Sequence, residues 1–415
     1  MFLIVYIWRI DSLGLVAAIL ILNLIFIVIV VGAFGIWLYL LFILKKSFDK
    51  SPIIKGGRDN TTNCDLLSVI IPARNEEKYI ENCVQSILNQ SAKAYEVLIV
   101  DDSSEDSTLT IVESFKNNPK VRIIPAGPKP DGWIGKNWPC YVGYKNAKGK
   151  YLMFTDADTI HSNNSLTDSL NTLLLEKMDV ITAVPRLMYP NFIIKMVLPI
   201  LSIFMFTRYS PMRVNDPKVE LGYLFGSYFV ITRECYEKVG THESVKNEIV
   251  EDGALGKKLK EEGFKLRMYR GENLIDAFWA RDFSTLWNSL KRLIVPLFFT
   301  DKKNSILIAV GIFLLMAFPY LMFSYSVGFY LASLVTDISY IFLLVVSVMC
   351  IIAIFGTNFY QLKRASTHKS IYGFGTPVGC FVVSISFLWS ILTSQNRAVI
   401  KWRGREYDYN KPVRT

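Results

Sequence analysis

Residues 13–44 form an almost uninterrupted apolar run that is broken only by Asn23. Because a helix of about 20 apolar residues crosses a bilayer, this run and similar runs at residues 305–326, 338–355 and 374–392 predict a membrane protein with about four spans. The first run exceeds the roughly 7–15 apolar residues of a signal peptide, so we expect it to remain as an anchor. With 51% apolar residues, the chain is not expected to be a soluble enzyme, a secreted protein or a disordered scaffold.

Basic residues beside the apolar runs predict the orientation in the membrane. Lys45, Lys46 and Lys50 follow the first run, whereas Arg9 precedes it. Since cytoplasmic loops carry the excess of Lys and Arg, we expect a multi-pass protein of the cell membrane with its N-terminus outside and residues 45–300 in the cytoplasm. One more crossing by the last run would put the basic tail outside, against this rule. Either that run is re-entrant or the number of spans differs.

About 240 residues with ordinary soluble composition separate the first and second runs. Their pattern alternates short apolar segments with segments of helical spacing. The expected strands are residues 66–71, 97–100, 121–124 and 151–154, and the expected helices are residues 76–90, 106–115 and 253–262. This alternation predicts an α/β fold with a Rossmann-like, mostly parallel sheet, in which ligands bind beyond the carboxyl ends of the strands.

These patterns divide the chain into five parts. They are a transmembrane anchor with a linker (residues 1–60), the α/β domain (61–282), an interfacial helix (283–303), C-terminal transmembrane helices (304–394) and a basic tail (395–415). Residues 192–206 are apolar but short for a span, so we expect them to lie in the membrane surface.

Acidic residues follow two of the predicted strands. Asp101 and Asp102 come after the second strand, and Asp156 and Asp158 come after the fourth. Because alternate residues of a strand point the same way, Asp156 and Asp158 could hold one hard divalent cation. Such an ion neutralises a diphosphate and improves it as a leaving group. The alternative is that these residues are solvated turn or cap aspartates.

Four segments in order resemble the signatures of the family 2 inverting glycosyltransferases with the GT-A fold. They are residues 69–76 (VIIPARNE), 100–104 (VDDSS), 154–158 (FTDAD) and 250–253 (VEDG). The resemblance covers residues 66–281. Residues 132–138 (GWIGKNW) and 402–407 (WRGREY) resemble a narrower group of membrane glycosyltransferases that act on lipids, namely the ceramide glucosyltransferase-like, hopene-associated and carotenoid glycosyltransferases.

The resemblance implies roles for individual residues on the donor side. Those expected to bind the nucleotide sugar are Pro72, Ala73, Arg74, Glu76, Asp102 at the base or ribose, Lys136 near the phosphates and Asp156 at the sugar or ribose. Asp158 would be the main ligand of a Mg²⁺ or Mn²⁺ cofactor, with Asp156 beside it. His161 could also reach the ion, although a polar residue at a helix start is the preferred interpretation.

Glu251 and Asp252 match the position of the catalytic acidic pair of the family. An inverting transfer needs a base that removes the proton of the acceptor hydroxyl, and Asp252 is the preferred candidate, with Glu251 next. The alternative is that the two carboxylates only stabilise the N-terminus of the helix that follows.

Acceptor contacts are less sharply indicated. The motif of processive members, Gln or Arg, two residues, then Arg-Trp, does not occur in residues 282–292, which disfavours a polysaccharide synthase. Trp287 and Lys291, at helical spacing, and Arg403 in the tail are candidate substrate contacts, although Trp287 and Lys291 are equally consistent with an interfacial anchor.

The sequence as a whole predicts transfer of a sugar from a nucleotide-sugar donor to the hydroxyl of a lipid acceptor. The expected partners are these two substrates and the membrane, with no nucleic acid. A polyprenyl-phosphate sugar synthase is the alternative enzyme. A non-catalytic transporter or scaffold is disfavoured because the apolar runs contain no charged residue.

Overall fold

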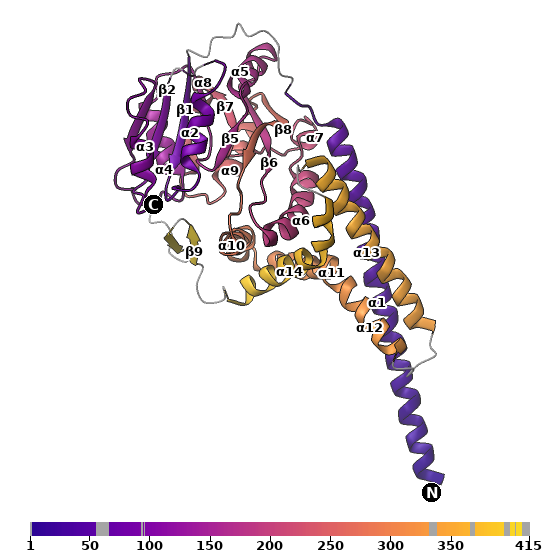
Figure 1. Ribbon diagram of the computed structural model, residues 1–415. Helices are drawn as coiled ribbons and strands as arrows, with labels where there is room; N and C mark the ends of the chain where they lie inside the picture. The colour runs from indigo at the N-terminus through magenta and orange to yellow at the C-terminus, as the bar shows by residue number, and fades with distance from the viewer. Residues whose placement is uncertain are drawn as a thin grey trace. The chain divides into compact units, whose positions relative to one another are not determined.

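The structure is a computed structural model that describes residues 2–54, 66–92, 94, 96–331, 338–365, 370–393, 399–402 and 404–408. The chain divides into two compact units. One comprises Met1–Lys45, Phe192–Ile203 and Leu293–Asn396 and contains the long apolar helices. The other comprises Lys46–Asn191, Phe204–Arg292 and Arg397–Thr415 and contains the β-sheet (Figure 1). The five domain limits expected from the sequence stay predictions.

The second unit is built around an eight-stranded sheet with the order β3-β2-β1-β4-β7-β6-β8-β5. Its strands are β1 (Leu67–Ala73), β2 (Glu96–Asp101), β3 (Val121–Pro125), β4 (Tyr151–Phe154), β5 (Thr159–His161), β6 (Val180–Leu187), β7 (Phe229–Thr232) and β8 (Leu266–Ala277). Strand β1 is parallel to β2 and β4, β2 is parallel to β3, and β6 is parallel to β8. Strand β7 is antiparallel to β4 and β6, and β5 to β8. The predicted α/β class is confirmed, with the antiparallel pairs added by the later strands.

Helices connect and cover these strands. They are α2 (Ile80–Leu88), α3 (Thr108–Glu113), α4 (Asn137–Asn146), α5 (Ser165–Leu175), α7 (Pro211–Val214), α8 (Arg233–Lys238) and α9 (Glu251–Glu261). Helix α2 shows why they form, because its apolar residues recur every three or four positions and bury one stripe against the sheet. A separate antiparallel hairpin of β9 (Val399–Trp402) and β10 (Arg405–Asp408) belongs to the same unit.

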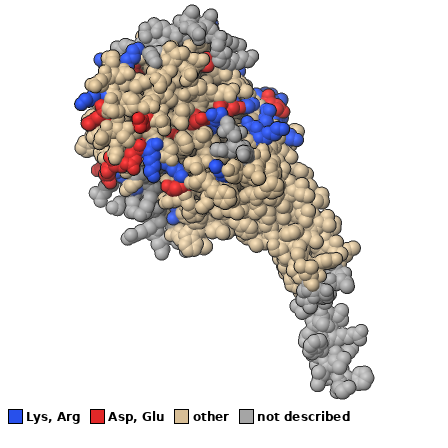
Figure 2. All heavy atoms as spheres, in the orientation of Figure 1, with Lys and Arg blue, Asp and Glu red and all other residues tan. Residues whose placement is uncertain are grey.

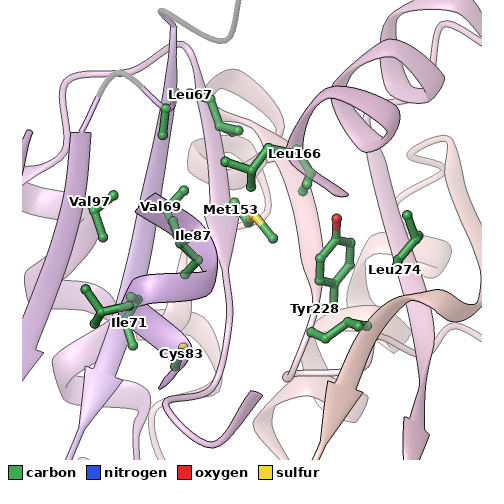
Figure 3. Close-up of a cluster of buried hydrophobic side chains, with 14 of the residues drawn as sticks. Leu67, Val69, Ile71, Cys83, Ile87, Val97, Met153, Leu166, Tyr228 and Leu274 are labelled. Atoms are coloured by element: carbon green, nitrogen blue, oxygen red, sulfur yellow. The ribbon is translucent and has the colours of Figure 1, made fainter. Parts of the chain in front are cut away.

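Packing on the two faces of β1 positions the loops that follow it. Val69 and Ile71 point to the face covered by α2, where they pack in one core cluster with Cys83 and Ile87 (Figure 3). Ile70 points to the face covered by α4, and a Cβ on Gly143 would lie only 2.5 Å from its Cγ2. This close approach holds α4 against β1.

The first unit is made of apolar helices. They are α1 (Phe2–Lys50), α6 (Phe192–Arg208), α10 (Phe283–Thr300), α11 (Lys302–Met316), α12 (Phe318–Leu331), α13 (Ile338–Ala365) and α14 (Thr376–Thr393), of which the ends of α1, α6 and α10 belong to the other unit. In the described residues, four segments are long and apolar enough to cross a membrane: Ala17–Lys50, Phe192–Val214, Ile338–Ala365 and Ser370–Thr393. The pair α11 and α12, bent by 47°, would be a fifth. On the face in Figure 2, charged side chains gather over the sheet-containing unit.

Two expectations about the apolar segments need comment. Asn23, the polar residue of the first run, is fully buried: its amide donates to Ser339 Oγ at 2.9 Å and accepts from the Tyr325 hydroxyl at 3.2 Å. It therefore joins helices within the apolar unit, as polar side chains between membrane helices do.

Residues 192–206 were expected to be too short for a span, but Phe192–Val214 is long and apolar enough to cross a membrane. Their position in the membrane surface stays a prediction.

Candidate active site

The loops that follow β1 and β2 are tied together by Arg74. Its buried guanidinium donates to the Asp102 carbonyl oxygen at 2.7 Å and to Glu105 Oε1 at 2.9 Å. The Asp102 N–H in turn donates to the Ala73 carbonyl at 2.8 Å. Pro72 and Ala73 form the end of β1, beside Val100 and Asp101 of β2. Arg74 thus fixes the shape of the predicted nucleotide pocket.

Asp102 lies at the centre of this corner, with only 1% of its side chain exposed. Its Oδ2 atom pairs with Lys129 Nζ at 3.3 Å and with the guanidinium of Arg405 from the C-terminal hairpin. Its Oδ1 atom is buried and has no hydrogen-bond partner among the described residues. The buried carboxylate of Asp102 is therefore held through one oxygen, Oδ2, by two cations.

Arg281 links the loop after β1 to the segment after β4. Its guanidinium pairs with Glu76 Oε2 and, at 2.7 Å, with Asp158 Oδ2, and it lies 4.3 Å above the ring of Tyr79. Burial lowers the pKa of Arg281, but the two carboxylates outweigh burial and raise it. Sequence reasoning missed this residue. Its signal is its position four residues after β8, a strand that the sequence analysis did not predict.

Lys136 joins Asp156 to the acidic pair of α9. It precedes the first residue of α4, and its ammonium lies 2.6 Å from Asp156 Oδ1 and 3.1 Å from Glu251 Oε1. Burial acts to lower the pKa of Lys136, but the carboxylates of Asp156, Glu251 and Asp252 raise it well above its ordinary value. The positively charged ammonium of Lys136 therefore lies between Asp156 on the predicted donor side and the predicted catalytic pair.

Glu251 and Asp252 begin α9 but have different surroundings. Glu251 is 7% exposed and pairs with Lys136, whereas Asp252 is partly exposed. The backbone N–H groups of Gly226 and Gly253 each donate to Asp252 at 2.8 Å. Burial raises the pKa of Glu251 to about 7 and also raises that of Asp252, while Lys136 opposes both shifts. Asp252 is thus an oriented, partly exposed carboxylate whose raised pKa makes it a stronger base than an ordinary aspartate.

Comparison with known proteins shows the class of enzymes that this chain resembles. The family model described as "Glycosyl transferase family 2" matches residues 68–240. The chain contains a family 2 glycosyltransferase domain. The chain resembles the 4,4'-diaponeurosporenoate glycosyltransferase of two strains of Staphylococcus aureus, USA300 and MRSA252. The USA300 protein is 24% identical over 370 residues, and the match covers 84% of this chain and 90% of the USA300 protein.

The fold is also that of a solved glycosyltransferase. The mannosyltransferase PcManGT from Pyrobaculum calidifontis, determined in complex with GDP-Man and Mn²⁺, matches with a TM-score of 0.53 at 16% identity. The match covers 90% of this chain and 99% of that one. The predicted family, GT-A fold and enzyme class are thereby confirmed, whereas the roles of individual residues stay predictions.

Trp287 and Lys291, two of the remaining predicted contacts, lie on α10 and do not join this cluster. Trp287 is half-buried on α10, with its ring 5.7 Å from that of Phe283, and Lys291 lies one turn further along. Within the residues the structure describes, neither is hydrogen-bonded or paired to the acidic side chains of the glycosyltransferase site. Arg403 lies outside the described residues.

His161 was weighed as a metal ligand, and its surroundings do not favour that role. It is the last residue of β5 and is buried, with Nε2 3.0 Å from the hydroxyl of Thr155 and 3.2 Å from that of Thr159. Burial lowers its pKa to about 3, which keeps the ring neutral. It is a buried strand residue and does not begin a helix.

The acidic pair after β4 was tested for a fit to a divalent ion. In the described part of the chain, no group of three or more His, Cys, Asp and Glu side chains is arranged to hold a metal. Asp156 and Asp158 are hard oxygen donors, and in this structure Lys136 and Arg281 balance their charges. The two carboxylates therefore fit a divalent ion that replaces positive charge already present.

Gly226 offers a direct test of this arrangement. A Cβ at this position would lie 2.6 Å from Lys136 Nζ and 2.9 Å from Asp252 Oδ2. Gly226→Ala should therefore displace the ammonium or the carboxylate and lower transfer on the order of 10²-fold, the usual cost of an ångström-scale misplacement. Steady-state transfer rates and thermal melting measure this, with Gly32→Ala, at a helical glycine with open space, as the control. A Gly226→Ala enzyme of parent activity would contradict the tight geometry.

Proposed function

We propose that this protein is a membrane-bound inverting glycosyltransferase that moves a sugar from a nucleotide-sugar donor to the hydroxyl of a lipid acceptor. The observation that carries the proposal is the ion pairing of Lys136 with both Asp156 and Glu251. These two ion pairs bring the segment after β4 beside the first turn of α9. A donor contact and a candidate base therefore lie on one edge of the sheet, where the loops of β1 and β2 also end.

The donor side would be formed by the loop from Pro72 to Glu76, by Asp102 and by the segment after β4. Asp158, with Asp156, would hold Mg²⁺ or Mn²⁺, and the bound ion would neutralise charge on the diphosphate as it leaves. The PcManGT complex with GDP-Man and Mn²⁺ supports a nucleotide sugar and a divalent ion as ligands of this fold. Arg281 and Lys136 add fixed positive charge to the same region.

The acceptor side would use Asp252 as the general base. The acceptor oxygen attacks the anomeric carbon on the face opposite the diphosphate, and its proton moves to the carboxylate of Asp252. The bond between the anomeric carbon and the diphosphate oxygen breaks, and the nucleoside diphosphate leaves with the electron pair. Hydrogen bonds from Gly226 and Gly253 orient Asp252, whereas Glu251 is engaged by Lys136.

A lipid acceptor is supported by the apolar helices and by the S. aureus relatives, which are named for 4,4'-diaponeurosporenoate. That name denotes a carboxylate, so an anionic acceptor is the second candidate. A lipid carboxylate or a polyprenyl phosphate already carries its charge and needs less of a base than a hydroxyl.

Transfer of radiolabelled sugar from nucleotide donors into a lipid extract tests this function. Membranes that contain the protein should yield labelled lipid, and membranes without it should not. A glycoside should survive mild acid and mild alkali, whereas mild acid cleaves a sugar phosphate and mild alkali cleaves an ester. Failure of every nucleotide sugar to label lipid would contradict the proposal.

Orientation is a separate prediction, because nucleotide sugars must reach the site from the cytoplasm. Asn117 is exposed, and the five described cysteines are buried. In Asn117→Cys, the new thiol should resist an impermeant reagent in intact cells and react once the membrane is opened. Asp11→Cys, at the predicted outer end of the first run, should react in intact cells, and the parent protein gives the background. Labelling of Asn117→Cys in intact cells would reverse the orientation.

A further inference from the structure

The C-terminal hairpin reaches the loops that end β1 and β2. Trp402 of β9 pairs with Arg405 of β10, so Arg405 lies directly beside the turn. Gly404 in that turn has a φ of 82°, a conformation that glycine adopts without steric cost. A Cβ on Gly404 would lie 3.6 Å from Asn75 Nδ2, which puts the turn against the loop after β1. Hairpin and sheet belong to the same compact unit.

Asp102 shows what this contact does. Arg405 pairs with Oδ2 of Asp102 and donates to its carbonyl oxygen at 3.3 Å, and Lys129 approaches Oδ2 at 3.3 Å. Both cations thus use the same carboxylate oxygen. The Oδ1 atom is buried and lacks a partner among the described residues, and a buried acceptor without a donor is costly. Oδ1 is thus the atom that a ligand with a hydroxyl or N–H group would satisfy, once the groups that cover this 1% exposed side chain make room for it.

We propose that the C-terminal hairpin completes the donor site, with Arg405 as a positioning residue that holds Asp102 through Oδ2 and presents Oδ1 to the nucleoside part of the nucleotide sugar. The inference rests on the proposed function, because it requires a nucleotide sugar at this edge of the sheet. Arg405 itself acts through Asp102. The buried carboxylate is held in one orientation because Lys129 and Arg405 both pair with Oδ2.

The same contact fixes where the tail lies. A hairpin that contacts Asp102 is on the same side of the membrane as the sheet, so the chain crosses the membrane an even number of times between Arg292 and Val399. The basic tail then obeys the positive-inside rule. A cysteine introduced at Thr415 should resist an impermeant reagent in intact cells, as Asn117→Cys should. Labelling of Thr415→Cys from outside would overturn the inference.

Nucleotide binding is the main test. The full-length protein in detergent with Mn²⁺ is titrated with UDP and with GDP by calorimetry. Arg405→Ala should weaken binding of the preferred nucleotide by about 10- to 100-fold, the usual effect of losing a charged hydrogen bond, and Arg405→Lys should recover part of it. Lys218→Ala, which removes an exposed charge from the same unit, should bind like the parent.

A double-mutant cycle separates positioning from a general structural role. If Arg405 acts through Asp102, Arg405→Ala should have no further effect on nucleotide binding in an Asp102→Ala protein. Additive losses, or an Arg405→Ala protein that binds as tightly as the parent, would overturn this inference and leave the glycosyltransferase proposal intact. A parent protein that binds neither nucleotide and transfers no sugar would overturn both.

Discussion

Asp252→Asn is expected to reduce the rate of sugar transfer by about 10²–10⁴-fold, the usual cost of removing a positioned base. The amide keeps the shape of the carboxylate, although its single oxygen can accept from only one of the two N–H groups, because Gly226 donates to Oδ2 and Gly253 to Oδ1. It cannot take the proton of the acceptor hydroxyl. The loss should therefore appear in turnover, while binding of the nucleotide, which we propose involves Asp102 and the loop after β1, should persist.

Turnover and nucleotide binding, measured on the same preparation, check this prediction. Asp131→Asn, at an exposed aspartate of the same unit, should match the parent in both. Because burial raises the pKa of Asp252, the base stays protonated to a higher pH than an ordinary aspartate, and transfer should rise as pH increases through that range. Near-parent turnover in Asp252→Asn would move the base elsewhere, first to Glu251. Loss of nucleotide binding would make Asp252 structural.

The first half of the sheet could be predicted because its strands consist mostly of apolar residues. Every residue of β2 is buried, and its four central residues, 97–100, are all apolar, with Glu96 and Asp101 only at the ends. Strand β8 could not be found in this way because it contains Arg267, Arg270 and Glu272. Arg270 is accommodated by Glu272 and by the carbonyl oxygen of Phe48, a partner 222 positions away that the local pattern cannot reveal.

In the candidate site, too, some residues could be predicted from the sequence and others could not. Asp102, Asp156 and Asp158 could be predicted because short strand-end motifs carry them. Two of their cationic partners could not, since Arg281 is 123 positions from Asp158 and Arg405 is 303 positions from Asp102. In the tail, the sequence favoured Arg403 as the substrate contact, and the structure puts Arg405 on Asp102. Two arginines separated by a turn glycine cannot be ranked until the strand pairing is known.

Asp158→Ala should lower transfer on the order of 10³-fold, because a divalent ion at a departing diphosphate is worth several kcal/mol. The fold should survive, since Arg281 keeps its contacts with Glu76 and the ring of Tyr79. Transfer rates and binding of Mn²⁺, followed by its electron paramagnetic resonance signal in the presence of UDP or GDP, should both fall. Asp131→Ala is the matched control.

Chelation decides between two ways of neutralising the diphosphate. If Asp158 and Asp156 hold a divalent ion, excess chelator should abolish transfer in the parent enzyme, and Mg²⁺ or Mn²⁺ should restore it. Arg281 and Lys136, which pair with these carboxylates in this structure, would then be free to contact phosphate oxygens. Full activity in excess chelator would exclude the ion. Arg281 and Lys136, which already pair with the two carboxylates, would then supply the positive charge, and Asp158→Ala would lower transfer by removing one of the two carboxylates that hold Arg281.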